Sequence, residues 1–188
     1  MLFRSQLSEL WSIMEFANPG MLGGAKAFRE RYAVPIERYG SEEAARELRR
    51  VTRGPIVVLT FDGDALDRYW LADYAAEMLA VERRRYPPIA TLVETLGGAC
   101  EVHAVPIPVD CVDGFSEAFY ARPEAFLDPA VRRSQSAWSF VPDDVQARIV
   151  ARLGADLASG EWDRRHGAWR AKPFFEGSLR GIVSRPPR

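Results

Sequence analysis

One short stretch of the chain, residues 56–61, is apolar at almost every position. A strand with that pattern is covered on both faces, as in a parallel sheet with helices on either side. We therefore expect an interior strand here, in an α/β fold. A second strand is expected over about 100–109, although Pro106 and Pro108 cannot donate to a ladder and so place its later half at an edge. A last strand over about 178–184 brings the expected total to three.

Apolar residues spaced three and four positions apart predict helices along much of the remaining chain. Three helices are expected before the first strand: one from Ser5, a short one marked by Phe28 and Tyr32, and one from Ser41. After the strand, apolar residues at every fourth position predict one long helix over about 62–86. Another helix is predicted over 89–96, where two glycines stop it.

Residues 110–173 follow as a mostly helical insertion, the kind of segment that often shapes a pocket. Its clearest helix begins after Pro142 and ends at Gly160. The loop 110–115 lies just past a strand, where ligand crevices of open α/β sheets form. It offers two carboxylates beside an aromatic ring, with simple turn chemistry as the alternative. The candidate substrate-binding residues are Asp110, Cys111, Asp113 and Phe115 from this loop and Trp70 and Tyr74 from the long helix, for which core packing is the alternative.

Composition narrows the class of protein. The 188 residues are 47% hydrophobic and 27% charged, which is ordinary for a globular chain. Lys and Arg number 25 against 26 Asp and Glu, so no overall field attracts nucleic acid or a membrane, and neither is expected as a partner. Cys100 and Cys111 form no disulfide framework, and no secretory core or membrane-length apolar run appears. We therefore expect reduced thiols and a cytoplasmic protein.

The motifs of phosphate, metal and nucleophilic chemistry are absent from this sequence. The pairs Gly23-Gly24 and Gly97-Gly98 are not glycine-rich strand-to-helix turns. His103 and His166 lie far apart and show no metal-ligand spacing, so no metal is expected. Cys111 with His166 as nucleophile and base is most simply a coincidence, and the sequence identifies no catalytic residue.

From about residue 41 to 186 the chain resembles the C-terminal half of a class I S-adenosylmethionine-dependent methyltransferase. Residues 44–62 match that family's helix, turn and fifth strand. Later stretches resemble a small-molecule subgroup, and they are Trp70-Leu71-Ala72-Asp73-Tyr74, residues 110–115, residues 122–129 and residues 160–167. The resemblance implies an incomplete Rossmann-like sheet of about three strands, with a large helical insertion and an N-terminal helical appendage.

The methyltransferase resemblance also implies S-adenosylmethionine as cofactor. In that family the donor sits on a glycine-rich loop after the first strand, and an acidic residue on the second strand holds its ribose. Neither element is found here, so binding of the donor by this chain alone is not expected. The implied activity is methyl transfer to a small molecule, inactive unless the missing half is supplied.

Residues 5–53 resemble a short segment of the first motor lobe of Swi/Snf-type helicase-like ATPases. The resemblance is carried by residues 7–23, then Phe28, Tyr32 and Pro35-Ile36. The ATP-binding lysine loop and the acidic metal-binding box of that family are absent, so ATPase activity is not expected. The helix predicted from Ser41 suits both families, and we divide the chain into 1–40, helicase-like, and 41–188, methyltransferase-like.

Two other functions stay open beside methyl transfer. One is a binding module that associates with itself or with a partner through an exposed sheet edge, because unpaired strands promote association. The other is a fragment of a DNA-dependent ATPase.

Overall fold

The computed structural model describes residues 24–28, 30 and 54–185, which fall into two compact units. One unit contains residues 60–88 and 103–180, and the other contains the remaining described residues. The short helix α2 (Ala25–Phe28) coincides with the helix expected near Phe28. The helices expected from Ser5 and Ser41 lie outside the described residues, and the division at residue 40 stays a prediction.

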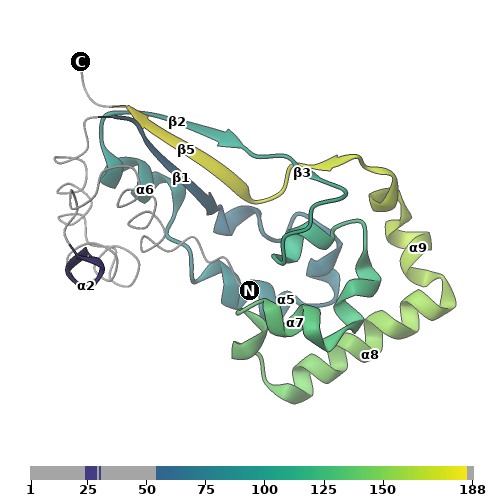
Figure 1. Cartoon of the computed structure of the whole chain (residues 1–188). Helices are drawn as coiled ribbons and strands as arrows, with labels where there is room; N and C mark the ends of the chain where they lie inside the picture. The colour runs from purple at the N-terminus through teal and green to yellow at the C-terminus, as the bar shows by residue number, and fades with distance from the viewer. Residues whose placement is uncertain (1–23, 29, 31–53, 186–188) are drawn as a thin grey trace. The chain divides into compact units, whose positions relative to one another are not determined.

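A three-stranded sheet has the order β1-β5-β2, formed by β1 (Ile56–Phe61), β5 (Leu179–Arg185) and β2 (Ala99–Ala104) (Figure 1). The Asp62 N–H donates to Ser178 O at 2.8 Å, and the Val105 N–H donates to Leu179 O at 3.0 Å. Both bonds join the end of an outer strand to the beginning of β5, which therefore runs antiparallel to β1 and β2. The three strands predicted from the sequence are confirmed.

The position of β1 differs from the expected interior strand. In the described sheet it lies at an edge and pairs with an antiparallel neighbour. Ile56 is buried, but Val57 is 67% exposed and Leu59 is 51% exposed. Because successive residues of a strand point to opposite faces, only one face of β1 is well covered among the described residues.

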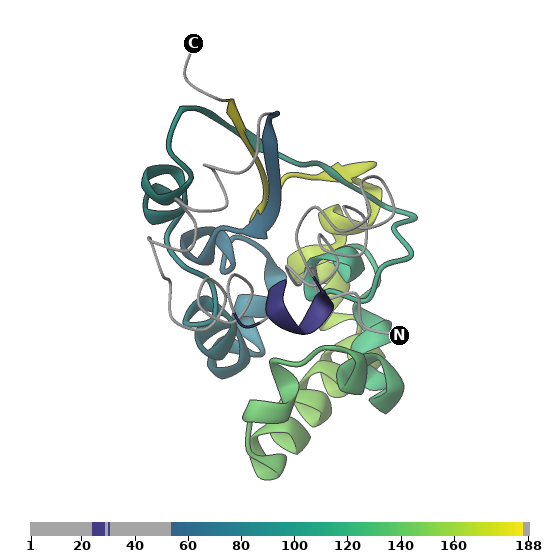
Figure 2. The same cartoon turned by 60° about the vertical axis from the view of Figure 1, so that its left-hand side comes forward.

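Helix α6 (Ile89–Leu96) packs on the covered face of the sheet, as the turned view in Figure 2 shows. Buried Leu96 lies in one cluster with Ile182 of β5 and with β1 residues. The helix ends where predicted, at Gly97 and Gly98, which both have positive φ. A side chain at Gly98 would overlap the Arg185 carbonyl oxygen, so this position requires glycine for space as well as for backbone conformation.

The single long helix predicted over residues 62–86 is wrong. Its place is taken by two 3₁₀ turns, η2 (Gly63–Ala65) and η3 (Trp70–Asp73), and by the helix α5 (Ala76–Arg83). Tyr69 has extended backbone, and it is buried together with the next two residues. An amphipathic helix buries one face, whereas here three consecutive side chains are buried on an irregular backbone.

The insertion is mostly helical, as predicted, and it begins and ends in a two-residue ladder. Strand β3 (Ile107–Pro108) pairs antiparallel with β4 (Phe174–Phe175), so the later half of the predicted second strand leaves the main sheet. Strand β4 was not predicted. The elements between them are η4 (Ser116–Phe119), η5 (Pro123–Leu127), α7 (Pro129–Ser134), η6 (Trp138–Phe140), α8 (Asp143–Ser159), α9 (Glu161–His166) and η7 (Gly167–Ala171).

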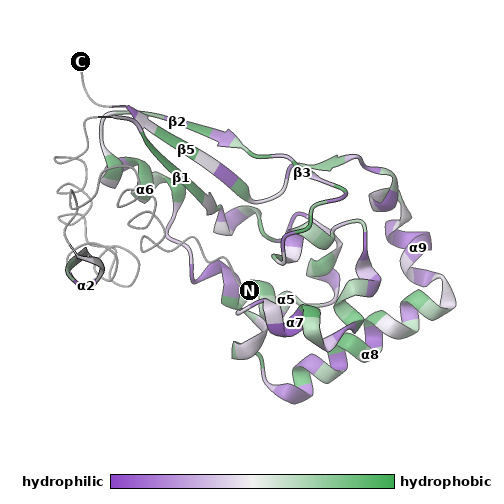
Figure 3. Ribbon diagram, in the orientation of Figure 1, coloured by the Kyte–Doolittle hydropathy of each residue, from purple (hydrophilic) through white to green (hydrophobic). Residues whose placement is uncertain are grey.

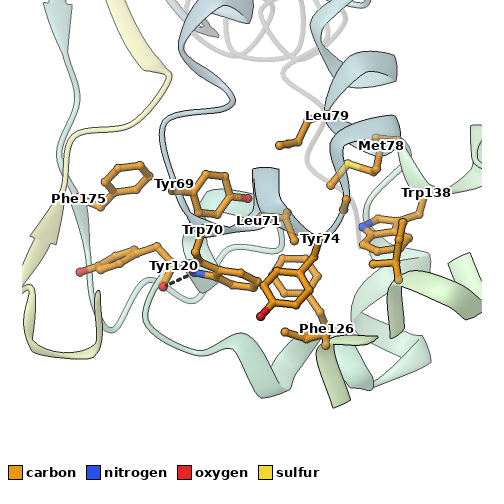
Figure 4. Close-up of a cluster of buried hydrophobic side chains, with 14 of the residues drawn as sticks. Tyr69, Trp70, Leu71, Tyr74, Met78, Leu79, Tyr120, Phe126, Trp138 and Phe175 are labelled. Carbon is orange, nitrogen blue, oxygen red and sulfur yellow. Dashed lines mark hydrogen bonds between the residues drawn. The ribbon is translucent and has the colours of Figure 1, made fainter. Parts of the chain in front are cut away.

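Helix α8 is the predicted amphipathic helix, and Gly160 ends it with φ 77°. Hydrophobic and hydrophilic residues alternate around it in Figure 3. Its Ile149 and Leu153 join an aromatic core around Trp70, shown in Figure 4. Around Trp70 the ring centroids lie 5.4 Å away for Trp162 and 5.7 Å away for Phe126, in edge-on geometry. This core holds the insertion against the residues that follow β1.

Candidate functional site

A largely buried ion pair lies at the carboxyl end of β1. Asp62 is the residue directly after the strand, and its Oδ2 accepts a hydrogen bond from Arg180 Nη2 at 3.2 Å. The other amino group of Arg180 donates to the carbonyls of Gly177 at 2.8 Å and Leu179 at 3.0 Å. The guanidinium thereby fixes the beginning of β5 beside the end of β1.

Glu117 of η4 lies beside the same segment and is fully buried, with an exposed fraction of 0%. Its two carboxyl oxygens accept hydrogen bonds from the backbone N–H of Ser178 at 2.8 and 3.0 Å. Burial raises the pKa of Glu117 to about 7, although the Ser178 groups and Arg180 act to lower that pKa. A carboxyl group with this pKa exchanges a proton near neutral pH.

Two buried hydroxyl groups complete what we name the Glu117 cluster: Asp62, Tyr69, Glu117, Ser178 and Arg180. Neither the Tyr69 hydroxyl nor the Ser178 hydroxyl has a hydrogen-bond partner among the described residues. The Ser178 hydroxyl is near enough to Glu117 to lower its pKa, and Ser116 acts likewise on Tyr69, but neither contact has full hydrogen-bond geometry. Burial first, and then the Glu117 charge, raise the pKa of Tyr69.

Trp70 and Tyr74 lie in the aromatic core, and their polar atoms already have protein partners. The Trp70 indole N–H donates to Tyr120 O at 2.7 Å, and the Tyr74 hydroxyl donates to Asp156 Oδ2 at 2.7 Å. Both rings are buried. These contacts are those of core residues. A contact of either residue with a substrate stays a prediction.

The four candidate residues from the loop 110–115 lie in different surroundings. Asp110 and Asp113 are exposed, and Asp113 Oδ1 accepts from the next backbone N–H at 2.6 Å, which is turn chemistry. Cys111 is half-buried against the aromatic core. The Phe115 ring lies 5.4 Å from the ring of Phe61, the last residue of β1. Of these four, Phe115 is therefore the residue whose ring contact places it at the carboxyl end of β1.

Sequence reasoning missed Glu117, Ser178 and Arg180. One signal was available, because Glu117 is the single acidic residue within the aromatic-rich run 115–120. A carboxylate is rarely buried, so a single acidic residue among apolar neighbours in a short helical turn is a candidate for a functional position. No comparable signal distinguishes Ser178 or Arg180, since their partners are remote in the sequence.

No metal centre and no nucleophile pair is assembled in the described part of the chain. It contains no group of three or more His, Cys, Asp or Glu side chains that could hold a metal ion. His166 packs on Tyr74 and Trp162 and faces Asp73 Oδ2 at 3.2 Å. Burial lowers the pKa of His166. None of its contacts involves Cys111.

The described glycines with positive φ do not fit the cradle that a nucleotide-like methyl donor needs. Positive φ angles among the described residues occur at Gly97, Gly98 and Gly160. The first two join a helix to a strand, and the third joins two helices. None lies in a strand-to-helix turn, where backbone N–H groups would face the donor.

Among the residues that the structure describes, no helix is long and apolar enough to span a membrane.

Comparisons with known proteins bear on both parts of the chain. A crystal structure described as "Putative methyltransferase from antibiotic biosynthesis pathway" from Anabaena variabilis matches with a TM-score of 0.71 and 30% identity, over 77% of this chain. "Putative ATP-dependent helicase/translocase YwqA" from Bacillus subtilis is 41% identical over 49 residues, or 26% of this chain. No protein-family model matches the chain.

The coverage of these relatives limits what they show. The chain spans 60% of the length of the methyltransferase and 5% of the length of the helicase. The mixed α/β architecture with a small sheet is that of an incomplete Rossmann-like fold. The chain therefore resembles a methyltransferase over most of its length and carries a short helicase-like segment, which confirms both resemblances found in the sequence.

Proposed function

We propose that this chain is the acceptor side of an S-adenosylmethionine-dependent methyltransferase acting on a small molecule. Its structural likeness to a methyltransferase from an antibiotic biosynthesis pathway is the observation that carries the proposal. The Glu117 cluster supports it, because it lies at the carboxyl end of β1, where ligands of open α/β sheets bind. Asp110, Cys111, Asp113 and Phe115 are the proposed acceptor contacts nearby in the sequence.

In this proposal S-adenosylmethionine supplies the methyl group from a site that the described residues do not build. The chain alone is then expected not to bind the donor or to turn over. Isothermal titration with S-adenosylmethionine tests this, with S-adenosylhomocysteine as a second probe and ATP as a nucleotide control. Micromolar binding of the first two, but not of ATP, would overturn the claim that the donor site is missing.

Methyl transfer itself is measured with labelled S-adenosylmethionine and a panel of small phenols and amines. The expected result is no label above that of the heat-denatured chain. Label transferred by the native chain would support a methyltransferase but refute its incompleteness, so the two parts of the proposal are tested separately.

A binding module is the second candidate, favoured by the exposed apolar face of β1. Val57 and Leu59 are both more than half exposed, and β1 lies at an edge of the described sheet. Such an edge pairs readily with another chain. Sedimentation is expected to show association that rises with concentration and falls in Val57→Lys. Val112→Lys is the matched control, because Val112 is fully exposed outside the sheet. A compact monomer at every concentration would count against a binding module.

The helicase-like segment suggests a third candidate, a fragment of a DNA-dependent ATPase. The likeness to a helicase/translocase covers only 49 residues, too few for a motor lobe. We expect no DNA-stimulated ATP hydrolysis, and measurable turnover would revive this candidate.

A further inference from the structure

Glu117 is buried, and among the described residues no cation bonds directly to its carboxyl group. Its carboxyl oxygens accept from the Ser178 backbone N–H, at 2.8 and 3.0 Å. Arg180 is near enough to act on its charge, but the guanidinium donates to Asp62 and to two backbone carbonyls instead. An ionised carboxylate in this position loses its hydration and gains little in return, whereas a neutral acid loses much less.

The proton of the neutral acid can also form a hydrogen bond inside the cluster. A protonated carboxyl group donates one hydrogen bond and still accepts others. The buried hydroxyls of Tyr69 and Ser178 both lack a partner among the described residues, and both interact electrostatically with Glu117. A proton on Glu117 would satisfy one of these oxygens while the Ser178 N–H bonds stay in place.

The backbone of Ser178 connects Glu117 to the end of β1 through two hydrogen bonds. Its N–H donates to Glu117, and its C=O accepts from the Asp62 N–H at 2.8 Å. One residue therefore links η4 of the insertion to the residue that follows β1. Loosening the Glu117 contact frees the peptide that holds Asp62 in position.

We propose that Glu117 is a proton-controlled clamp that fastens the insertion to the beginning of β5 and, through Ser178, to the end of β1. With its proton bound, the clamp is closed, because the buried carboxyl group is then neutral and can donate to one of the unpaired hydroxyl oxygens beside it. When opening exposes the carboxyl group to water, the proton passes to solvent and the clamp is released. This inference is independent of the proposed methyl transfer.

The neighbouring charges come from every element around Glu117. They are Arg180 on β5, Asp62 after β1, and Glu82 on α5, which acts on Tyr69. Arg180 is paired with Asp62 at 3.2 Å and Glu82 with Arg85 at 3.1 Å, so both of these guanidinium groups already have a carboxylate partner other than Glu117. Its pKa of about 7 lies above the value of 4.5 for a free glutamate, so the closed clamp binds more protons than the open one. Stability from Glu117 is then fully present below pH 4.5 and is lost as pH rises to about 7.

The test combines two nuclear magnetic resonance measurements on the whole chain. The carboxyl carbon of Glu117 is titrated directly, and a midpoint near neutral pH is expected. Amide exchange of Ser178 and Asp62 is followed as a protection factor, which corrects for the intrinsic rate. Protection is expected to be constant below about pH 4.5, to fall by up to about tenfold per pH unit between there and the midpoint, and to level off above it.

Glu117→Gln is the informative variant, because an amide both donates and accepts but cannot ionise. It should keep the protection of Ser178 and change by less than about twofold over the same pH range. Glu77→Gln is the matched control, since Glu77 is exposed and paired with Arg148, and it should behave as the unsubstituted chain. A Glu117 midpoint near 4.5 would overturn the proposal, and so would pH-dependent protection that persists in Glu117→Gln. If that variant does not fold, the carbon titration of the unsubstituted chain decides alone.

Discussion

Replacing Trp70 by phenylalanine should destabilise the chain strongly. The change removes the indole N–H that donates to Tyr120 O at 2.7 Å, and an unpaired buried carbonyl costs about 1–3 kcal/mol. The smaller ring also loses edge contacts with Trp162 and Phe126 and leaves a void, for about 1–2 kcal/mol more. The sum, about 2–5 kcal/mol, is a large part of the 5–15 kcal/mol or so that stabilises a typical domain.

Urea unfolding followed by circular dichroism measures this loss. With a slope of about 2 kcal/mol per molar urea, the midpoint should fall by about 1–2.5 M. Phe140→Ala is the control, because Phe140 is 61% exposed and its loss should cost less than about 1 kcal/mol. A Trp70→Phe midpoint within the error of the unsubstituted chain would refute the packing argument. Unchanged stability with a changed affinity for small phenols would instead support Trp70 as a substrate contact.

Two further predictions concern backbone and surface. Gly98→Ala should lower the melting temperature much more than Gly160→Ala, because both positions have positive φ but only Gly98 lies against the Arg185 carbonyl. Equal losses, near 1 kcal/mol each, would show that space at Gly98 does not matter. Arg170→Lys should cost about 1 kcal/mol in urea unfolding, since the guanidinium stacks 4.7 Å from the Trp162 ring centroid and its planar shape is lost. No loss would show that the positive charge alone is sufficient.

The elements that could be predicted from sequence are those whose residues satisfy a local rule. Strand β1 is apolar at every position except Thr60, α6 ends at a pair of glycines, and α8 carries a regular apolar stripe before Gly160. In each case the pattern of burial repeats within the element itself. The segment after β1 has no such repeating pattern, because residues 69–71 are all buried in succession within the core.

The candidate site was less predictable for a related reason. Glu117 and Ser178 are separated by 61 positions, and Asp62 and Arg180 by 118. No local spacing reveals that such residues meet, because the fold of the whole insertion determines it. One residue singled out from the sequence, Phe115, lies against the last residue of β1, and its role in binding a substrate stays a prediction.

The short ladder between β3 and β4 has an evolutionary consequence. Ile107 pairs with Phe175, and the Val109 N–H donates to Pro173 O, so the chain leaves and re-enters at nearly one point. The entropy of closing such an excursion grows only with the logarithm of its length, by about 0.6 kcal/mol per doubling. Mutation can therefore lengthen or trim the loops of the insertion that lie outside its aromatic core while the strands on either side keep their register. A lineage could vary these loops in this way without having to rebuild its scaffold.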